Sequence, residues 1–271
     1  RWLPGIASGE SIATVALIED SGRWDLDGVG LVATADASGW VLDGHKSFVL
    51  DGHLATLVLV VARTGDGGGN NANGGGLGLF AVEGDASGLV RTPLSTMDQT
   101  RKQARLEFSR TPAELVGTAG SAGPGVEKTL QLAAVALAAE QVGGAQHCLD
   151  SSVEYAKTRI QFGRPIGSFQ AIKHKCADLL LEVESARSAA YYAGWAAAED
   201  SDELPLVASL AKSYCSEAYF HAAAENIQIH GGIGFTWEHD AHLYFKRAKS
   251  SELLFGDPAY HRELLAQRIG I

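Results

Sequence analysis

The stretch VEKTLQLAAVALAAEQVGGAQHCLDSSVEYAKTR, Val126 to Arg159, decides the fold of the second half of the chain. Its apolar residues recur at near-helical spacing, at Val126, Leu130, Leu137, Val142 and Leu149. This near-helical spacing favours a helix. The many alanine and glycine positions allow neighbouring helices to approach closely. The stretch therefore predicts one long helix that packs against others.

Further helices are predicted downstream. The segment SFQAIKHKCADLLLEVESARSAAYYAGWAAA, residues 168–198, has one apolar stripe, formed by Phe169, Ile172, Cys176, Leu179, Val183 and Ala186. Two more helices are expected at Leu204–Ile229 and Glu238–Arg268, separated by a break at Gly231–Gly234. Four long helices with short connections predict a four-helix bundle.

The first half of the chain has a different pattern. Between Ser11 and Val116, β-branched runs with alternating polarity are bounded by glycine and aspartate, as in GLVATAD, ATLVLVVART and GLGLFAVEG. These runs predict an antiparallel β domain. The segment GDGGGNNANGGG, Gly65–Gly76, predicts a plain hairpin loop, because a strand and not a helix follows it. The linker-like TAGSAGPG then divides an α+β chain into a β-rich domain, residues 1–119, and a helical domain, residues 120–271.

Composition excludes several classes of protein. The 271 residues carry 22 basic and 32 acidic side chains, a net charge of −10, which argues against nucleic-acid binding. No apolar run is long enough to span a membrane, and no signal peptide is visible. Three scattered cysteines fit reduced thiols and a cytoplasmic protein. The chain begins with Arg1 and not with methionine, so we expect a processed product or a fragment.

Two motifs carry a family resemblance. They are YAKTRIQFGRPIGSFQAIKHKCADL, Tyr155–Leu179, and IQIHGGIGF, Ile227–Phe235. In this order they resemble the acyl-CoA dehydrogenase family, and SGESIATVALIED and VLDGHKSFVLDG resemble strands of its middle domain. The resemblance implies a β-barrel-like middle domain followed by a C-terminal four-helix bundle. The helical domain that precedes them in the family is absent from this sequence.

The resemblance also implies FAD as the cofactor, held mainly by a neighbouring subunit across a dimer interface. Arg159 and the pair Gly231–Gly232 suit its diphosphate, because a guanidinium and close backbone amides bind phosphate oxygens. The full set implied for the cofactor is Arg159, Gln161, Phe162, Ile166, Phe169, Gln228, Gly231 and Gly232. In the alternative interpretation, Arg159 only caps its helix and the glycines only break theirs.

The catalytic base of the family has no counterpart in this chain. The reaction requires a carboxylate that removes a proton next to the thioester. Most members carry a glutamate before a glycine in the last helical segment, where this chain has Phe255 followed by Gly256. A minority carry it on the helix that opens the bundle, where this chain has Ala133, followed by Ala134 in place of an arginine that assists acyl-CoA binding. Neither phenylalanine nor alanine accepts a proton.

The flavin-binding strands depart from the family as well. The family's Thr-Glu-Pro run reads Ile18-Glu19-Asp20 here, and its Trp-x-Thr run has Phe48 and Leu50. A flavin bound there would lose hydrogen bonds worth about 1 kcal/mol each. The chain is thus expected to keep the half-site that it lends to a partner and to have lost its own.

This asymmetry resembles heteromeric actinobacterial acyl-CoA dehydrogenases associated with steroid breakdown, in which one subunit lacks the glutamate. It implies a paralogous partner that carries the base and binds acyl-CoA, with an electron-transfer flavoprotein as acceptor. One alternative is a self-sufficient enzyme with a displaced base, at Glu252, Asp257 or the more distant Glu140. Another is a non-enzymatic structural paralogue. No metal site is expected from the histidines, which are His221, His230, His239 and His242.

Overall fold

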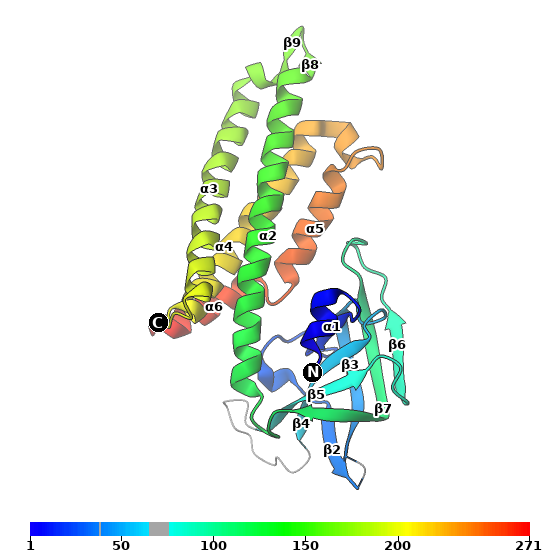
Figure 1. Ribbon diagram of the computed structural model, residues 1–271. Coiled ribbons are helices and arrows are strands. Elements are labelled where there is room, and N and C mark those ends of the chain that lie inside the picture. The colour runs from blue at the N-terminus through cyan, green and yellow to red at the C-terminus, as the bar shows by residue number, and fades with distance from the viewer. Residues whose placement is uncertain (38, 65–75) are drawn as a thin grey trace. The chain divides into compact units, whose positions relative to one another are not determined.

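The computed structural model describes residues 1–37, 39–64 and 76–271, which form two compact units, Arg1–Glu127 and Lys128–Ile271 (Figure 1). The first unit consists mainly of strands and the second consists of helices. The loop predicted at Gly65–Gly76 lies outside the described residues except for Gly76, but the strands on either side of it pair antiparallel as a hairpin requires.

The first unit contains a sheet that closes on itself. Its elements are α1 (Leu3–Ser8), β1 (Ala13–Ala16), η1 (Leu26–Gly28), β2 (Val32–Asp36), β3 (Gly39–Leu50), β4 (Leu57–Thr64), β5 (Leu77–Glu83), β6 (Leu89–Pro93) and β7 (Gln103–Val116). The strand order is β1-β4-β2-β3-β7-β5, and β6 pairs with β7. Because β4 also pairs with β5, the path β4-β2-β3-β7-β5 returns to β4.

The sheet is mixed, so the prediction of an antiparallel domain is wrong for two pairs of strands. β4 runs parallel to both β1 and β2. After β3 the chain reverses direction, and β4 pairs with β2. Because β2 is antiparallel to β3, a strand that reverses after β3 runs parallel to β2. Alternating polarity reveals which face of a strand is buried but not which strand lies next to it.

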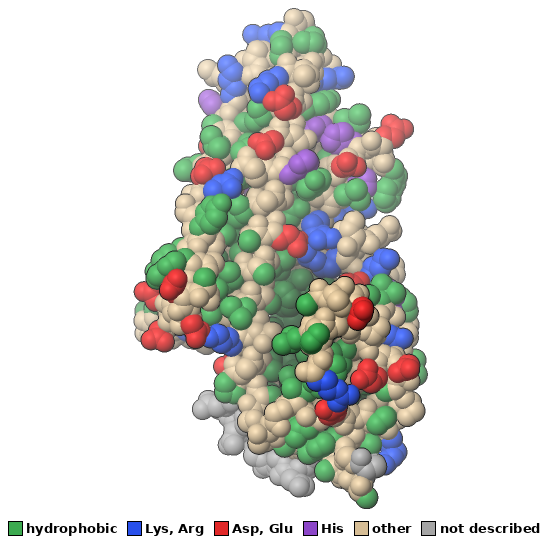
Figure 2. Space-filling model, in the orientation of Figure 1, with side chains coloured by type: hydrophobic (Ala, Val, Ile, Leu, Met, Phe, Trp, Pro, Cys, Tyr) green, Lys and Arg blue, Asp and Glu red, His purple; other side chains and the backbone are tan. Residues whose placement is uncertain are grey.

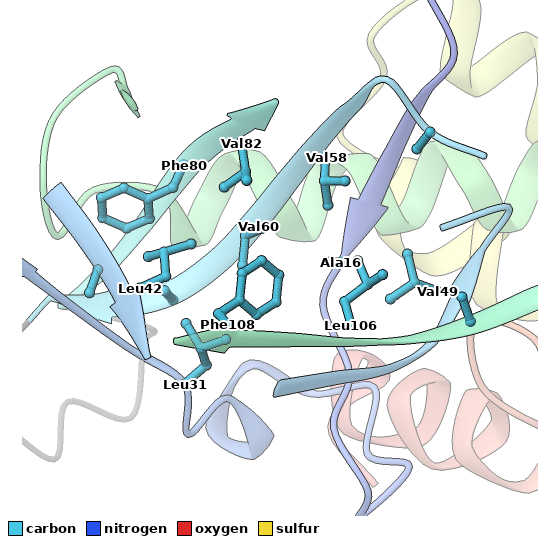
Figure 3. Packing of buried hydrophobic residues seen from close by; sticks show 14 residues of the cluster. Ala16, Leu31, Leu42, Val49, Val58, Val60, Phe80, Val82, Leu106 and Phe108 are labelled. Carbon is cyan, nitrogen blue, oxygen red and sulfur yellow. The ribbon is translucent and has the colours of Figure 1, made fainter. Parts of the chain in front are cut away.

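The core of this unit lies inside the closed sheet. Side chains of β4, β5 and β7 point toward one another there, as Figure 3 shows for Val58, Val60, Phe80, Leu106 and Phe108. Burying each such side chain contributes about 1.5–3 kcal/mol.

A buried ion pair links β3 to the segment that follows β1. Lys46 on β3 is fully buried, and its Nζ donates to Glu19 Oε1 at 2.9 Å and to the Leu17 carbonyl at 2.7 Å. The same Glu19 oxygen accepts the backbone N–H groups of Gly30 and Leu31, both at 2.8 Å. Burial lowers the pKa of Lys46 to about 8. The pair of Glu19 and Lys46 thus joins three segments of backbone, residues 17–19, residues 30–31 and β3.

The second unit contains five helices where four were predicted. They are α2 (Gly123–Thr158, which begins in the first unit), α3 (Gln170–Ala198), α4 (Leu204–His230), α5 (Ala241–Leu253) and α6 (Pro258–Ile269). The single helix expected at 238–268 is divided at residues 254–257. Gly256 has φ +101°, which a helix does not allow, and Asp257 accepts the Tyr260 N–H as the N-cap of α6 just before Pro258.

The helices pack through small residues. Two clusters of buried residues bring α2, α3 and α4 together, with alanine and cysteine at most of the contacts. At the closest approach, a Cβ added to Gly144 on α2 would lie 2.4 Å from the ring of Tyr219 on α4. Glycine at this position lets a tyrosine ring fill the space between two helices.

Candidate functional site

The first motif forms a tight hairpin beyond the end of α2. β8 (Ile160–Gln161) pairs antiparallel with β9 (Arg164–Pro165), and the two turn residues between them, Phe162 and Gly163, have φ +52° and +76°. Two consecutive positive φ values are typical of a type I′ hairpin turn. The Arg159 carbonyl accepts the Ile166 N–H at 2.8 Å, which closes the base of the hairpin. The strands lie at one end of the helical unit (Figure 1).

This hairpin projects an aromatic side chain. Phe162 is 91% exposed, although its ring meets that of Phe169 edge-on, with centroids 6.1 Å apart. The guanidinium of Arg164 lies 4.2 Å from the centroid of the Phe169 ring. Sequence reasoning missed both the hairpin and Arg164. The pair Phe162-Gly163 was the one signal for the hairpin in the sequence. A two-residue type I′ turn needs positive φ at both central positions, and glycine at the second position favours such a turn.

The end of α4 lies beside the end of α2. Tyr155 on α2 stacks on His230, the last residue of α4, with centroids 4.3 Å apart, and Ser152 Oγ donates to Asn226 Oδ1 at 3.0 Å. His230 in turn contacts the ring of His239. Burial lowers the pKa of His230, so the neutral ring is favoured. These contacts place the second motif next to the first.

The residues predicted to bind the cofactor are therefore gathered at one end of the helical unit. The side chains of Arg159 and Gln228 are exposed there. Gly231 has φ +64°, and Cβ atoms added to Gly231 or Gly232 would meet nothing within 4 Å. Exposed backbone, a guanidinium and aromatic rings suit the diphosphate and adenine of a dinucleotide. The residues present thus fit FAD.

Phe255, which the sequence predicts to stand at the principal base position of the family, lies in a turn that buried side chains contact from two sides. Phe255 has φ +61°, a conformation that a bulky residue rarely adopts. Lys212 on α4, itself fully buried, donates to the carbonyls of Glu252 and Gly256 at 3.0 and 2.9 Å. His261 Nε2 on α6 donates to the Phe255 carbonyl at 2.9 Å.

The carboxylates considered as displaced bases all have structural partners. Glu252 forms an ion pair with Lys249 at 3.0 Å, and Asp257 caps α6. Glu140 lies 3.3 Å from the guanidinium of Arg247. Ala133, at the second base position, is partly exposed on α2, and Ala134 is buried.

In the β unit, the residues predicted to replace the family's flavin-binding residues have structural roles as well. Ile18 is buried, and Asp20 accepts hydrogen bonds from Ser47 and Arg105. Phe48 lies in a register shift of β3 with φ +56° and is 43% exposed. Leu50 ends the strand, and its carbonyl accepts the Thr14 hydroxyl at 2.6 Å.

Across residues 1–37, 39–64 and 76–271, no three metal-ligating side chains gather in one place. Within the same ranges, every helix is too short or too polar to cross a membrane.

A β unit followed by helices whose exposed end suits a dinucleotide is typical of flavin-dependent acyl dehydrogenases. Comparison with protein-family models agrees: residues 14–111 match the acyl-CoA dehydrogenase middle domain, and residues 124–270 match the acyl-CoA dehydrogenase C-terminal domain. The chain belongs to the acyl-CoA dehydrogenase family, whose members are FAD-dependent flavoproteins.

Individual relatives cover the chain to different extents. The acyl-CoA dehydrogenase IpdE2 of Mycobacterium tuberculosis is 49% identical over 173 residues, 64% of this chain and 49% of that protein. The probable acyl-CoA dehydrogenase YngJ of Bacillus subtilis is 32% identical over 98% of this chain and 70% of its own length. The butyryl-CoA dehydrogenase structure from Megasphaera elsdenii superposes with TM-score 0.91 at 26% identity, over 99% of this chain and 70% of that one. The chain spans about half the length of IpdE2.

Proposed function

We propose that this chain is a subunit of an FAD-dependent acyl-CoA dehydrogenase that contributes half of a shared FAD site and carries no catalytic base. One observation supports this most directly. The exposed end of the helical unit retains an arginine, open glycine backbone and aromatic rings, whereas the base position holds Phe255 in a firmly held turn.

Five residues of the proposed half-site have assigned roles. The Arg159 guanidinium would bind a diphosphate oxygen, and the open backbone at Gly231 and Gly232 would let the diphosphate approach closely. Phe162 and Phe169 would contact the adenine ring. The neighbouring side chains that complete the half-site are Gln161, Ile166 and Gln228. FAD, when bound, supplies the acceptor for the hydride that leaves the acyl chain.

The lack of a base follows from chemistry at position 255. A proton next to a thioester is removed by a group that lies within hydrogen-bonding reach and accepts the proton. A phenyl ring has no such atom, and the nearest carboxylates, Glu252 and Asp257, are used by Lys249 and by the N-terminus of α6. Their contacts support structural roles in preference to a displaced base. We expect Glu252→Gln with Asp257→Asn to leave the activity of the assembled enzyme nearly unchanged.

The partner in this proposal is a paralogous subunit that supplies the rest of the flavin site, the glutamate and the acyl-CoA pocket. Its substrate class is a steroid-derived acyl-CoA, by resemblance to the heteromeric actinobacterial members of the family. An electron-transfer flavoprotein would reoxidise the flavin.

The test is the flavin content of the chain purified alone and co-expressed with a paralogue that retains the glutamate. Visible absorbance should show flavin only in the complex, at half a flavin per chain. Arg159→Ala should remove most of it. Arg262→Ala is the matched control, because Arg262 is also an exposed arginine and its partner is Glu217 on α4. Full flavin occupancy in the lone chain would refute the shared site.

Phe162→Ala provides a second measurement. Since its ring is 91% exposed, we expect the unfolding free energy to change by less than about 0.5 kcal/mol, while flavin retention in the complex falls. If neither the chain nor any complex binds flavin, the chain is a structural paralogue instead.

A further inference from the structure

A pocket of about 410 Å³ lies between the end of α2 and the start of α3, within the helical unit. Val153 and Ala156 line it from α2, Ile172 lines it from α3, and Pro165 and Gly167 line it from the segment that joins the two helices. None of these residues belongs to the proposed half-site. Small-molecule sites commonly enclose about 300–1,000 Å³, with mostly apolar walls and a few polar groups. This pocket therefore has the size and the lining of a ligand site.

The wall formed by η2 (Ile166–Ser168) is fixed by backbone contacts. A Cβ added to Gly167 would lie 2.9 Å from the carbonyl oxygen of Ala156, so glycine lets η2 lie directly against α2. The preceding residue, Ile166, donates its N–H to the Arg159 carbonyl at 2.8 Å. Both contacts are made within the chain itself. The wall is thus formed before any ligand arrives, as it is at most small-molecule sites.

Two ammonium groups belong to the lining of the pocket. Lys157 contributes one from α2 and Lys173 the other from α3, and both side chains are exposed. Lys157 forms an ion pair with Glu154 at 2.6 Å. The ammonium of Lys173 meets no carboxylate among residues 1–37, 39–64 and 76–271. The pocket therefore offers positive charge beside an apolar wall.

The surrounding segment strengthens this charge. Residues 155–177 contain five lysine and arginine side chains and no aspartate or glutamate, in a chain whose net charge is −10. Lysine and arginine side chains are visible at this end of the helical unit in Figure 2. A local excess of one charge attracts ligands of the opposite charge, whatever the net charge of the whole chain. The pocket is therefore suited to an anion.

The thiol of Cys176 completes the lining and is uncharged. Burial, followed by the charge of Glu225, raises the pKa of Cys176. The thiol therefore stays protonated near neutral pH and does not repel an anion. The apolar wall in turn requires an apolar ligand body, because a ligand that is polar throughout would lose its hydration there without new partners. An anion with a hydrocarbon body meets both requirements.

We propose that this pocket binds a carboxylic acid with an apolar body, whose carboxylate pairs with Lys157 and Lys173 and whose hydrocarbon lies against Val153 and Ile172. Fatty acids and steroid acids share this chemistry. The proposal goes beyond the shared flavin site and is independent of it, because the two sets of residues do not overlap.

Cys176 itself reports whether the pocket is occupied. Cys148 and Cys215 are buried, so a neutral reagent such as iodoacetamide should alkylate the native chain at Cys176, as the mass of its peptide would show. Saturating octanoate or deoxycholate, each below its micelle concentration, should slow this alkylation at least fivefold. Protection by one acid alone would distinguish a fatty-acid site from a steroid-acid site. Octan-1-ol, which lacks the charge, should protect only at concentrations several-fold higher.

Substitution of a lysine tests the charge. Lys173→Gln should raise the concentration of acid needed for half-protection about three- to fivefold, as expected for the loss of a partly exposed ion pair. Lys128→Gln is the matched control, because Lys128 is an exposed lysine of α2 whose partner is Asp200. It should leave that concentration unchanged. Calorimetric titration of Cys176→Ser with the same acid should give the same affinity without the reporter thiol.

The measurements are made on the chain alone and on its complex with the paralogue. Failure of both acids to protect Cys176, or equal protection in the wild type and Lys173→Gln, would overturn the proposal. Protection that disappears in the complex would also overturn it, because a neighbouring subunit would then cover the pocket. Alkylation is followed without reference to flavin, so failure here is distinct from failure of the shared site.

Discussion

The burial of His261 makes the stability of this protein depend on pH in a way that can be calculated. Burial on α6, followed by the charge of Lys212, lowers the pKa of His261 from 6.5 to about 4. The unfolded chain binds a proton at His261 below pH 6.5, whereas the folded chain does not until the pH approaches 4. The contribution to stability is therefore full above pH 6.5 and is lost progressively as the pH falls toward 4.

The magnitude follows from the two pKa values. The difference between 6.5 and about 4 corresponds to about 3 kcal/mol in full, of which about 2 kcal/mol is lost by pH 5. The assay compares urea unfolding of the wild type and His261→Gln at pH 7.5 and pH 5.

The variant isolates the histidine from the other titrating groups. A glutamine amide can still donate to the Phe255 carbonyl, so we expect a loss of about 1 kcal/mol at pH 7.5. Between pH 7.5 and pH 5, the variant should lose about 2 kcal/mol less than the wild type. Lys212, Asp257 and Arg268, the charged groups that act on His261, are present in both proteins. Equal losses in the two proteins would refute the reasoning.

Two further predictions concern packing and buried charge, and both are checked by denaturant titration. Gly144→Ala should lower the unfolding free energy by about 1–3 kcal/mol, because its Cβ would lie 2.4 Å from the Tyr219 ring. Gly143→Ala, whose Cβ meets nothing within 4 Å, should raise it by about 0.5–1 kcal/mol. Lys46→Met should cost about 3 kcal/mol, since it leaves the Glu19 carboxylate without its ammonium, and adding Glu19→Gln should recover part of that loss. A double variant as unstable as the sum of the two single variants would contradict the pairing.

Sequence periodicity predicted the individual elements well, because each depends on local spacing. The strands at 57–64 and 77–83 and the helix at 204–230 lie where their apolar patterns placed them. The arrangement of the strands was less accessible. That β4 runs parallel to β2 depends on a chain reversal whose direction no residue within β4 records. The division between α5 and α6 had a signal in Gly256-Asp257-Pro258, but the helical spacing on both sides obscured it.

For the candidate site too, part could be predicted from the sequence and part could not. The motifs at 155–179 and 227–235 could be found in the sequence, and the structure brings them to one end of the helical unit through the contact between Tyr155 and His230. The contacts that hold these segments in place could not be predicted from the sequence. The Phe162-Gly163 turn is a backbone conformation, and the buried side chains of Lys212 and His261 donate hydrogen bonds to backbone carbonyls. Contacts to backbone depend on three-dimensional approach and leave no spacing pattern in the chain.

The hydrogen bonds of Lys212 and His261 stabilise the turn at the predicted base position without using the side chain of residue 255. Both side chains bind carbonyls of the turn, at Gly256 and Phe255, and neither contact depends on which side chain residue 255 carries. Glycine at 256 is required in any case, because a Cβ there would lie 2.3 Å from the Tyr260 ring. A glutamate could therefore be replaced by phenylalanine without dismantling the turn. A subunit relieved of catalysis by its partner would keep this turn, because α4, α5 and α6 meet there and its hydrogen bonds stabilise the fold.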